Sequence, residues 1–183
     1  LLLRSIDKFI VFMSNYSLFD SHTQVAHFKN LNFVDSKKLC CLGFGSLKGV
    51  DTNIFNIDSS KREYYRSKYL IPEKSFVLLY LGRINPDKGI ATLLDIYTHL
   101  AKKYSDMYLL IVGPDDGFIF PDLPPNSKIR RFDFTAHPEV FYICSDLYIL
   151  PSAREGFGSS VIEAASCGVP TIGSSIDGLN ESI

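Results

Sequence analysis

The fold is decided by Arg154-Glu155-Gly156-Phe157-Gly158-Ser159-Ser160-Val161-Ile162-Glu163-Ala164-Ala165. The apolar residues Leu147 to Leu150, just before it, predict a buried strand that ends at a short loop through Pro151. A helix is expected to begin near Ser159. A strand, a glycine-containing loop and a helix in this order are typical of α/β proteins that hold a ligand at the end of a strand.

The loop carries two glycines and a carboxylate, and a second carboxylate follows eight residues later. Gly156 and Gly158 have no Cβ, so backbone N–H groups there can converge on an anion. The unsatisfied amides at the helix N-terminus add a partial positive charge. With Glu155 and Glu163 beside such an anion site, the stretch indicates a ligand with a phosphate end and a hydroxyl-rich end. A nucleotide-sugar fits that description.

Three other interpretations stand beside this one. Ser160 and Glu163 also form an S-x-x-E capping box, which would give Glu163 a structural role. Gly156 and Gly158 also suit a simple turn. The two acids of a glycosidase lie ~5–9.5 Å apart, whereas eight residues of continuous helix span ~12 Å. That separation favours two ends of one ligand over two sides of one bond.

Glu155 and Glu163 match the E-x7-E signature of retaining glycosyltransferases of the glycosyltransferase-B fold. The similarity continues through Thr135 to Glu139, Ser145 to Ser152 and Cys167 to Gly173. Together these segments resemble family 4 glycosyltransferases of the group 1 type, and most of all those that build bacterial surface polysaccharides. The resemblance implies the donor-binding domain of a hexosyltransferase that uses a nucleotide-diphosphate sugar and no metal or other cofactor.

Composition sets broad limits on the kind of protein. The 183 residues allow one substantial core, and 46% apolar with 21% charged residues is ordinary for a globular protein. A net charge of −1 gives no indication of nucleic-acid binding. No apolar run approaches the ~18 residues of a membrane span. The four cysteines have no metal-ligand spacing, so we expect a reducing, cytoplasmic environment without disulfides.

Continuous apolar runs and helical spacing predict a doubly wound parallel sheet. Strands are expected at residues 9–13, 38–42, 76–81, 108–112, 128–132, 147–150 and 169–172, and helices at 17–28, 59–70, 88–104, 138–144 and 159–167. In such sheets the ligand binds outside the carboxyl ends of the strands.

A glycine-rich loop runs from Gly43 to Thr52. It begins as G-x-G but lacks the third glycine and the helix of a dinucleotide fingerprint. In the resemblance this loop, with Gly45, Ser46 and Gly49, is the crossover between two domains and lies near the donor. Residues 1–57 are accordingly expected to be the end of an acceptor-side domain plus the linker, and residues 58–183 a truncated nucleotide-sugar-binding domain. We expect such a fragment to be inactive alone.

A second cluster, Gly82 to Gly89, follows the strand at residues 76–81 and contains Arg83 and Lys88 on either side of a proline turn. Both side chains are in a position to meet one diphosphate, although Asp87 is also placed to pair with one of them. The resemblance favours the first interpretation, because G-R-x-x-x-x-K-G is the pyrophosphate-binding element of these transferases. Catalysis would then rest on Arg83, Lys88 and Glu155.

The resemblance assigns the other donor contacts as well. It implies that Glu155 holds hydroxyls of the hexose and Glu163 those of the ribose, and that donor binding also involves Gly82, Gly113 and the amides of Gly156, Phe157 and Gly158. The loop from Gly113 to Gly117 resembles the one that lies near the nucleobase in these transferases, although its two aspartates also suit a plain turn.

Three functions follow in order of preference. The first is a retaining transferase that acts on a glycan or lipid-linked sugar, in the cytoplasm or at the inner face of the membrane. The second is a non-catalytic nucleotide-sugar-binding module that partners a separate subunit; the flanking reading frame distinguishes the two. A nicotinamide-dependent oxidoreductase is disfavoured, because no strand is followed by G-x-G-x-x-G. The sequence does not specify the donor, the acceptor or the linkage.

Overall fold

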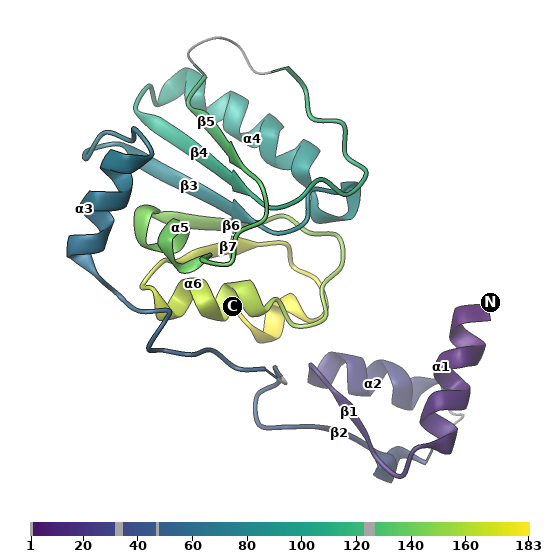
Figure 1. Ribbon diagram of the computed structural model, residues 1–183. Helices are drawn as coiled ribbons and strands as arrows, with labels where there is room; N and C mark the ends of the chain where they lie inside the picture. Colours follow the sequence, from purple (N-terminus) through teal and green to yellow (C-terminus); the bar gives the residue numbers. More distant parts are fainter. Residues whose placement is uncertain (1, 32–34, 47, 123–126) are drawn as a thin grey trace. The chain divides into compact units, whose positions relative to one another are not determined.

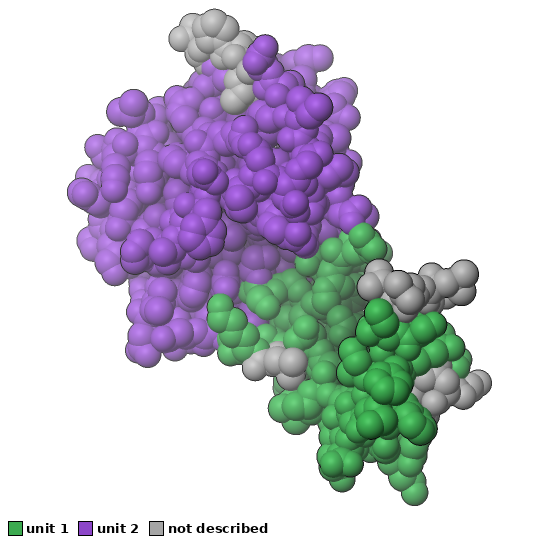
Figure 2. Space-filling model, turned by 45° about the vertical axis from the view of Figure 1, so that its right-hand side comes forward, with its two compact units in different colours: residues 1–49, 154–159, 175–182 green, residues 50–153, 160–174, 183 purple. Residues whose placement is uncertain are grey.

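The computed structural model describes residues 2–31, 35–46, 48–122 and 127–183. Its contacts divide the chain into two compact units, coloured separately in Figure 2. Unit 1 comprises residues 1–49, 154–159 and 175–182, and unit 2 comprises residues 50–153, 160–174 and 183. The predicted domain boundary between residues 57 and 58 stays a prediction.

Unit 1 contains a small layer of two parallel strands with helices. Its elements are α1 (Leu2–Met13), β1 (Ser17–Phe19), α2 (His22–Asn30), β2 (Leu39–Cys41) and the 3-10 helices Ser36–Lys38 and Leu179–Glu181. Val11, Val25 and Leu39 form its buried core. Other apolar side chains of α1, such as Phe9, Ile10 and Phe12, are exposed and do not contribute to this core.

Two predictions for unit 1 were wrong. Residues 9–13 belong to α1 and not to a strand, because the short apolar run continues a helical spacing that starts upstream at Leu3 and Ile6. The helix predicted from residue 17 begins only at His22. Its N-cap is Ser21, whose hydroxyl accepts a hydrogen bond from the Gln24 N–H at 3.3 Å and so fixes the start of the helix.

Unit 2 is built on a five-stranded parallel sheet with the strand order β5-β4-β3-β6-β7 (Figure 1). Its strands are β3 (Phe76–Leu81), β4 (Met107–Val112), β5 (Ile129–Phe132), β6 (Leu147–Leu150) and β7 (Thr171–Gly173), and its helices are α3 (Ser59–Lys68), α4 (Ile90–Lys103), α5 (Glu139–Cys144) and α6 (Ser159–Ser166). These bounds lie within one or two residues of most of the predicted ones. The predicted α/β fold is confirmed for this unit.

The strand order reverses between β3 and β6, which lie side by side. From β3 the chain steps outward through α4 to β4, and from β6 it steps the opposite way through α6 to β7. Right-handed crossovers in opposite directions place the two helices on opposite faces of the sheet. Such a reversal opens a crevice at the carboxyl ends of the two central strands, which is where α/β sheets bind ligands.

A charge cluster around the buried Arg66 holds the amino ends of β3 and β6 together. Arg66 of α3 is only 3% exposed and bonds Asp146 at 2.7 Å and the Cys144 carbonyl at 2.9 Å. Asp146 also pairs with Arg62 and accepts the Val77 N–H at 2.8 Å. The same Asp146 donates its own N–H to the Val77 carbonyl, so it joins the two strands in both directions.

No helix in the described part of the chain is long and apolar enough to cross a membrane.

Replacing Asp146 by Ala leaves the buried Arg66 guanidinium without its carboxylate. We expect this variant to lose about 3 kcal/mol of unfolding free energy or more, measured by urea denaturation. The control is Asp106→Ala, which removes a carboxylate that is 84% exposed and should cost less than about 1 kcal/mol. Equal losses in the two variants would contradict the anchoring role.

Candidate active site

The loops that follow β3 and β4 contact each other directly at the carboxyl edge of the sheet. The Ile84 N–H donates to the Pro114 carbonyl at 2.9 Å, and the Asp116 N–H donates to the Ile84 carbonyl at 3.0 Å. Gly113 has φ +143°, and a Cβ there would lie 2.0 Å from the Gly82 carbonyl oxygen. Gly82 and Gly113, which were both predicted to bind the donor, are therefore adjacent. Only a glycine at position 113 permits this close approach to the Gly82 carbonyl.

Arg83 forms an exposed ion pair across these loops. Its guanidinium lies 2.7 Å from Asp116, with side-chain exposures of 64% and 45%. Asn85 donates to the same Asp116 oxygen at 3.0 Å. The sequence interpretation treated Asp116 as a turn residue and missed this contact. An exposed pair contributes at most about 1 kcal/mol, so a diphosphate can compete for Arg83.

Lys88 ends a 3-10 helix, Pro86–Lys88, in the same loop. The Asn85 side chain accepts the Lys88 N–H at 3.1 Å and caps this turn. The turn packs against the segment after β6, because the Ala153 N–H donates to the Asp87 carbonyl at 2.8 Å. The loops after the two central strands are thus joined at the point where the strand order reverses.

In unit 1, the glycine loop contacts the stretch that follows Glu155. A Cβ on Gly45 would lie 2.6 Å from the Asp20 carbonyl oxygen and 2.7 Å from the ring of Phe157, which is buried. The Gly156 carbonyl accepts the Gln24 side-chain amide at 3.2 Å. These contacts place Gly45 beside the loop that follows Glu155. That the glycine loop lies near the donor stays a prediction.

The neighbouring residues of the glycine loop complete this arrangement. Ser46 has φ +59°, donates its N–H to the Asp20 carbonyl at 2.8 Å and accepts the Gly49 N–H at 3.1 Å. Leu47 lies outside the described residues. Gly178 also lies close to the loop at Glu155 and Gly156. A Cβ on Gly178 would meet the carbonyl oxygens of Glu155 and Gly156 at 2.6 and 2.4 Å.

Glu163 lies in α6, half buried, and its carboxylate accepts the Tyr142 hydroxyl at 3.2 Å. The alternative interpretation, a capping box, places Ser160 at the N-cap, but α6 already begins at Ser159. The Ser160 hydroxyl instead lies 2.8 Å from the Tyr148 hydroxyl. Burial, together with the nearby Tyr148 and Glu163, raises the pKa of Tyr142 well above its usual range. Tyr142 therefore stays a hydrogen-bond donor at neutral pH.

The cysteines that were expected to pack as small apolar side chains are buried. Burial raises the pKa of the Cys144 thiol to about 12 and that of Cys167 to about 11. Both thiols are therefore protonated at neutral pH and are poor nucleophiles or metal ligands. Among the described residues no group of three or more His, Cys, Asp or Glu side chains is arranged to hold a metal ion. Metal independence stays a prediction.

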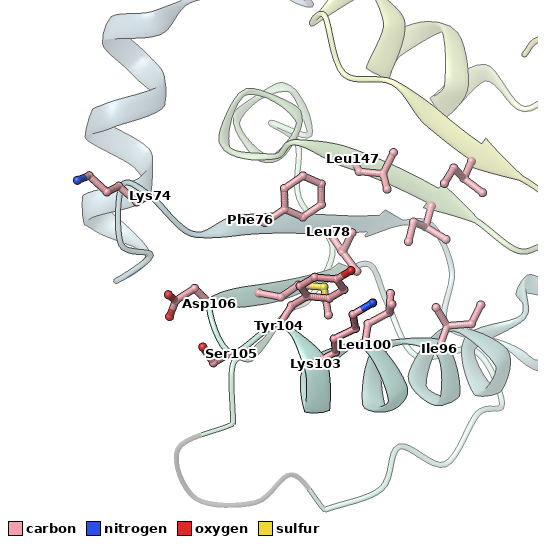
Figure 3. A pocket seen from close by; sticks show the side chains of 13 residues that line it. Lys74, Phe76, Leu78, Ile96, Leu100, Lys103, Tyr104, Ser105, Asp106 and Leu147 are labelled. Atoms are coloured by element: carbon pink, nitrogen blue, oxygen red, sulfur yellow. The ribbon is translucent and has the colours of Figure 1, made fainter.

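Unit 2 also contains a large apolar groove (Figure 3). It has a volume of about 730 Å³ and lies between α4 and one face of the sheet, near the amino ends of the strands. Leu78, Leu147 and Ile149 of the sheet are among the residues that line it, together with Lys103 and Asp106. The groove contains none of the predicted site residues.

Together these features define a doubly wound α/β protein with glycines and basic side chains at the carboxyl ends of its two central strands. The family of glycosyl transferases group 1 matches residues 61–183, and the chain belongs to this family. The expected family resemblance is confirmed.

Individual proteins show the same relationship. The chain is 30% identical over 160 residues to the capsular polysaccharide biosynthesis glycosyltransferase CapM of Staphylococcus aureus, covering 83% of this chain and 41% of CapM. It is 29% identical over 135 residues to the O-antigen biosynthesis glycosyltransferase WclY of Escherichia coli, covering 70% of this chain and 36% of WclY. The chain thus spans less than half the length of these relatives.

A solved structure of HepE from Anabaena, in complex with UDP-glucose, superimposes with a TM-score of 0.81 at 20% identity, covering 98% of this chain and 50% of HepE. This similarity confirms the predicted glycosyltransferase-B fold.

The two units each bring together part of the predicted site. Unit 2 holds Gly82, Gly113, Arg83, Lys88 and Glu163, and unit 1 holds Gly45, Ser46, Gly49, Glu155, Gly156, Phe157 and Gly158. That all of them grip one ligand stays a prediction.

The junction between the central loops can be tested at Gly89. Gly89 has φ +72° and a Cβ there would lie 2.0 Å from the Pro151 carbonyl oxygen, whereas Gly117 has φ +85° and open space around it. The backbone strain of an alanine, about 1–2 kcal/mol, is common to both positions. We expect Gly89→Ala to lose about 1–3 kcal/mol more unfolding free energy than Gly117→Ala in urea denaturation. Similar losses would show that the close approach is unimportant.

Proposed function

We propose that this chain is the donor-binding part of a retaining hexosyltransferase that uses a nucleotide-diphosphate sugar. The observation that carries the proposal is the reversal of strand order between β3 and β6. The loop with Arg83 and Lys88 follows β3, and the segment that leads into Glu155 follows β6. Ligands of open α/β sheets bind at such a reversal.

Arg83 and Lys88 are proposed to bind the diphosphate. During transfer the bond between the anomeric carbon and the diphosphate oxygen breaks, and its electron pair leaves with the diphosphate. The new bond forms to an acceptor hydroxyl oxygen, whose proton is released. Negative charge on the departing oxygen grows toward the transition state, so the two cations stabilise that state more than the bound donor.

The acidic side chains and backbone amides are proposed to hold the two sugars. Glu155 would accept hydrogen bonds from hexose hydroxyls and Glu163 from ribose hydroxyls, since ionised carboxylates accept such bonds strongly. The amides of Gly156, Phe157 and Gly158, just before α6, would hold the sugar and the β-phosphate, because N–H groups at a helix start favour anions. No metal ion is required in this arrangement.

The names of the relatives support a role in making surface polysaccharides. CapM is named for capsular polysaccharide biosynthesis, WclY for O-antigen biosynthesis, and HepE was solved with UDP-glucose. We propose that the acceptor is a glycan or a lipid-linked sugar, and that the protein works in the cytoplasm or at the inner face of the membrane. A non-catalytic module that partners another subunit is the alternative, and the assay below distinguishes it.

Arg83→Ala and Lys88→Ala should each lower kcat/KM for sugar transfer by about tenfold or more, because each removes a charge-assisted hydrogen bond worth about 1.5–3 kcal/mol. The assay is release of nucleoside diphosphate by the intact protein with UDP-glucose, ADP-glucose or GDP-mannose and a glycan acceptor. Product NMR reports whether the anomeric configuration is retained.

Lys102→Ala, at an exposed lysine in the last turn of α4, is the control and should transfer sugar at the parent rate. Parent-like activity in both Arg83→Ala and Lys88→Ala would refute the proposed donor site. Donor binding by the parent protein without any transfer would support the non-catalytic alternative.

A further inference from the structure

Two fully buried tyrosines end at one face of α6. Tyr142 comes from α5 and Tyr148 from β6, and both have 0% exposure. Their rings pack edge to face with centroids 5.6 Å apart. Each hydroxyl reaches a polar side chain of α6: Tyr142 donates to Glu163 at 3.2 Å, and the Tyr148 hydroxyl lies 2.8 Å from that of Ser160. Figure 1 shows α5, β6 and α6 in the same part of unit 2.

The position of the Tyr142 hydroxyl is set by its surroundings. The ring packs against Phe55 at 6.1 Å as well as against Tyr148, so it has little rotational freedom. A buried phenol needs a hydrogen-bond partner, and the half-buried carboxylate of Glu163 supplies it. The contact therefore fixes where one oxygen of Glu163 lies.

We infer that Tyr142 is a positioning residue that holds the Glu163 carboxylate in the orientation in which it accepts the ribose hydroxyls of the donor. The inference rests on the proposed function, which assigns Glu163 to the ribose. A carboxylate has about four acceptor sites, so the bond from Tyr142 does not exhaust its capacity. The hydroxyl of Tyr142 contacts Glu163 and acts on the ligand through it.

Tyr148 provides a matched comparison. It is as buried as Tyr142 and its hydroxyl also bonds a side chain of α6, one turn before Glu163. It additionally donates to the Leu81 carbonyl at 3.0 Å. Each variant removes one buried hydroxyl that bonds a side chain of α6, and the Tyr142 hydroxyl is the one that donates to the Glu163 carboxylate.

The test is calorimetry of the intact protein with UDP, ADP and GDP, followed by the tightest of these and its 2′-deoxy form. The parent should bind the ribose form about tenfold or more tightly than the deoxy form, because a hydrogen bond to a charged group is lost. Glu163→Ala should abolish this preference. Tyr142→Phe should reduce it about two- to tenfold and leave affinity for the deoxy form unchanged. Tyr148→Phe should keep the parent preference.

A second variant tests the same contact with every tyrosine in place. Glu163→Asp shortens the side chain by one methylene and draws the carboxylate away from Tyr142, so it should reduce the preference as Tyr142→Phe does. Adding Tyr142→Phe to Glu163→Asp should then change nothing further. Circular dichroism checks that each variant is folded at the assay temperature.

The outcomes separate the inference from the proposed function. If the parent binds none of the three diphosphates, or binds ribose and deoxy forms equally, the proposed ribose site is overturned and the inference with it. If Glu163→Ala loses the preference while Tyr142→Phe keeps it, the inference alone is overturned, whatever Glu163→Asp does. It is also overturned if Tyr148→Phe reduces the preference as much as Tyr142→Phe.

Discussion

The contact between β3 and β6 is the constraint on which the rest of unit 2 depends. These strands lie side by side although the chain visits β4 and β5 between them. Asp146 and Val77 exchange hydrogen bonds at the amino ends, and Arg66 and Arg62 neutralise the carboxylate. Because parallel strands extend in register, this junction also brings their carboxyl ends together. The loop with Arg83 and Lys88, which follows β3, and the segment after β6 that leads into Glu155 become neighbours only because β3 and β6 lie side by side.

Within unit 2, the sequence was sufficient to predict nearly every helix and strand. Strands buried on both faces are continuous apolar runs, and β4, buried at all six positions, is the clearest example. The same reasoning failed for α1, because five apolar residues in a row do not distinguish a strand from one face of a helix. The apolar residues upstream, Leu3 and Ile6, were the missed signal.

The contacts that shape the site were less predictable. Arg83 pairs with Asp116, 33 residues away, because β3 and β4 are neighbours, and spacing along the chain does not reveal that. Tyr142 and Glu163 meet because α5 and α6 lie close together above the sheet. Residues within one motif, such as Arg83 and Lys88, were identified from sequence and family resemblance. Partners contributed by another helix or strand could be identified only once the strand order was known.

The amino and carboxyl ends of the strands in the unit 2 sheet differ in how strongly their charged side chains are paired. At the amino edge the buried Arg66 is paired with the partly buried Asp146, whereas Arg83 and Asp116 at the carboxyl edge are exposed and weakly coupled. Substitutions of exposed, weakly paired side chains at the carboxyl edge therefore cost little folding free energy, whereas a closely packed glycine there, such as Gly89, does not tolerate a side chain. Under the proposed function, substitutions of exposed loop side chains can alter which donor is bound while the anchor at Asp146 and Arg66 is kept. This physical independence makes the architecture evolvable.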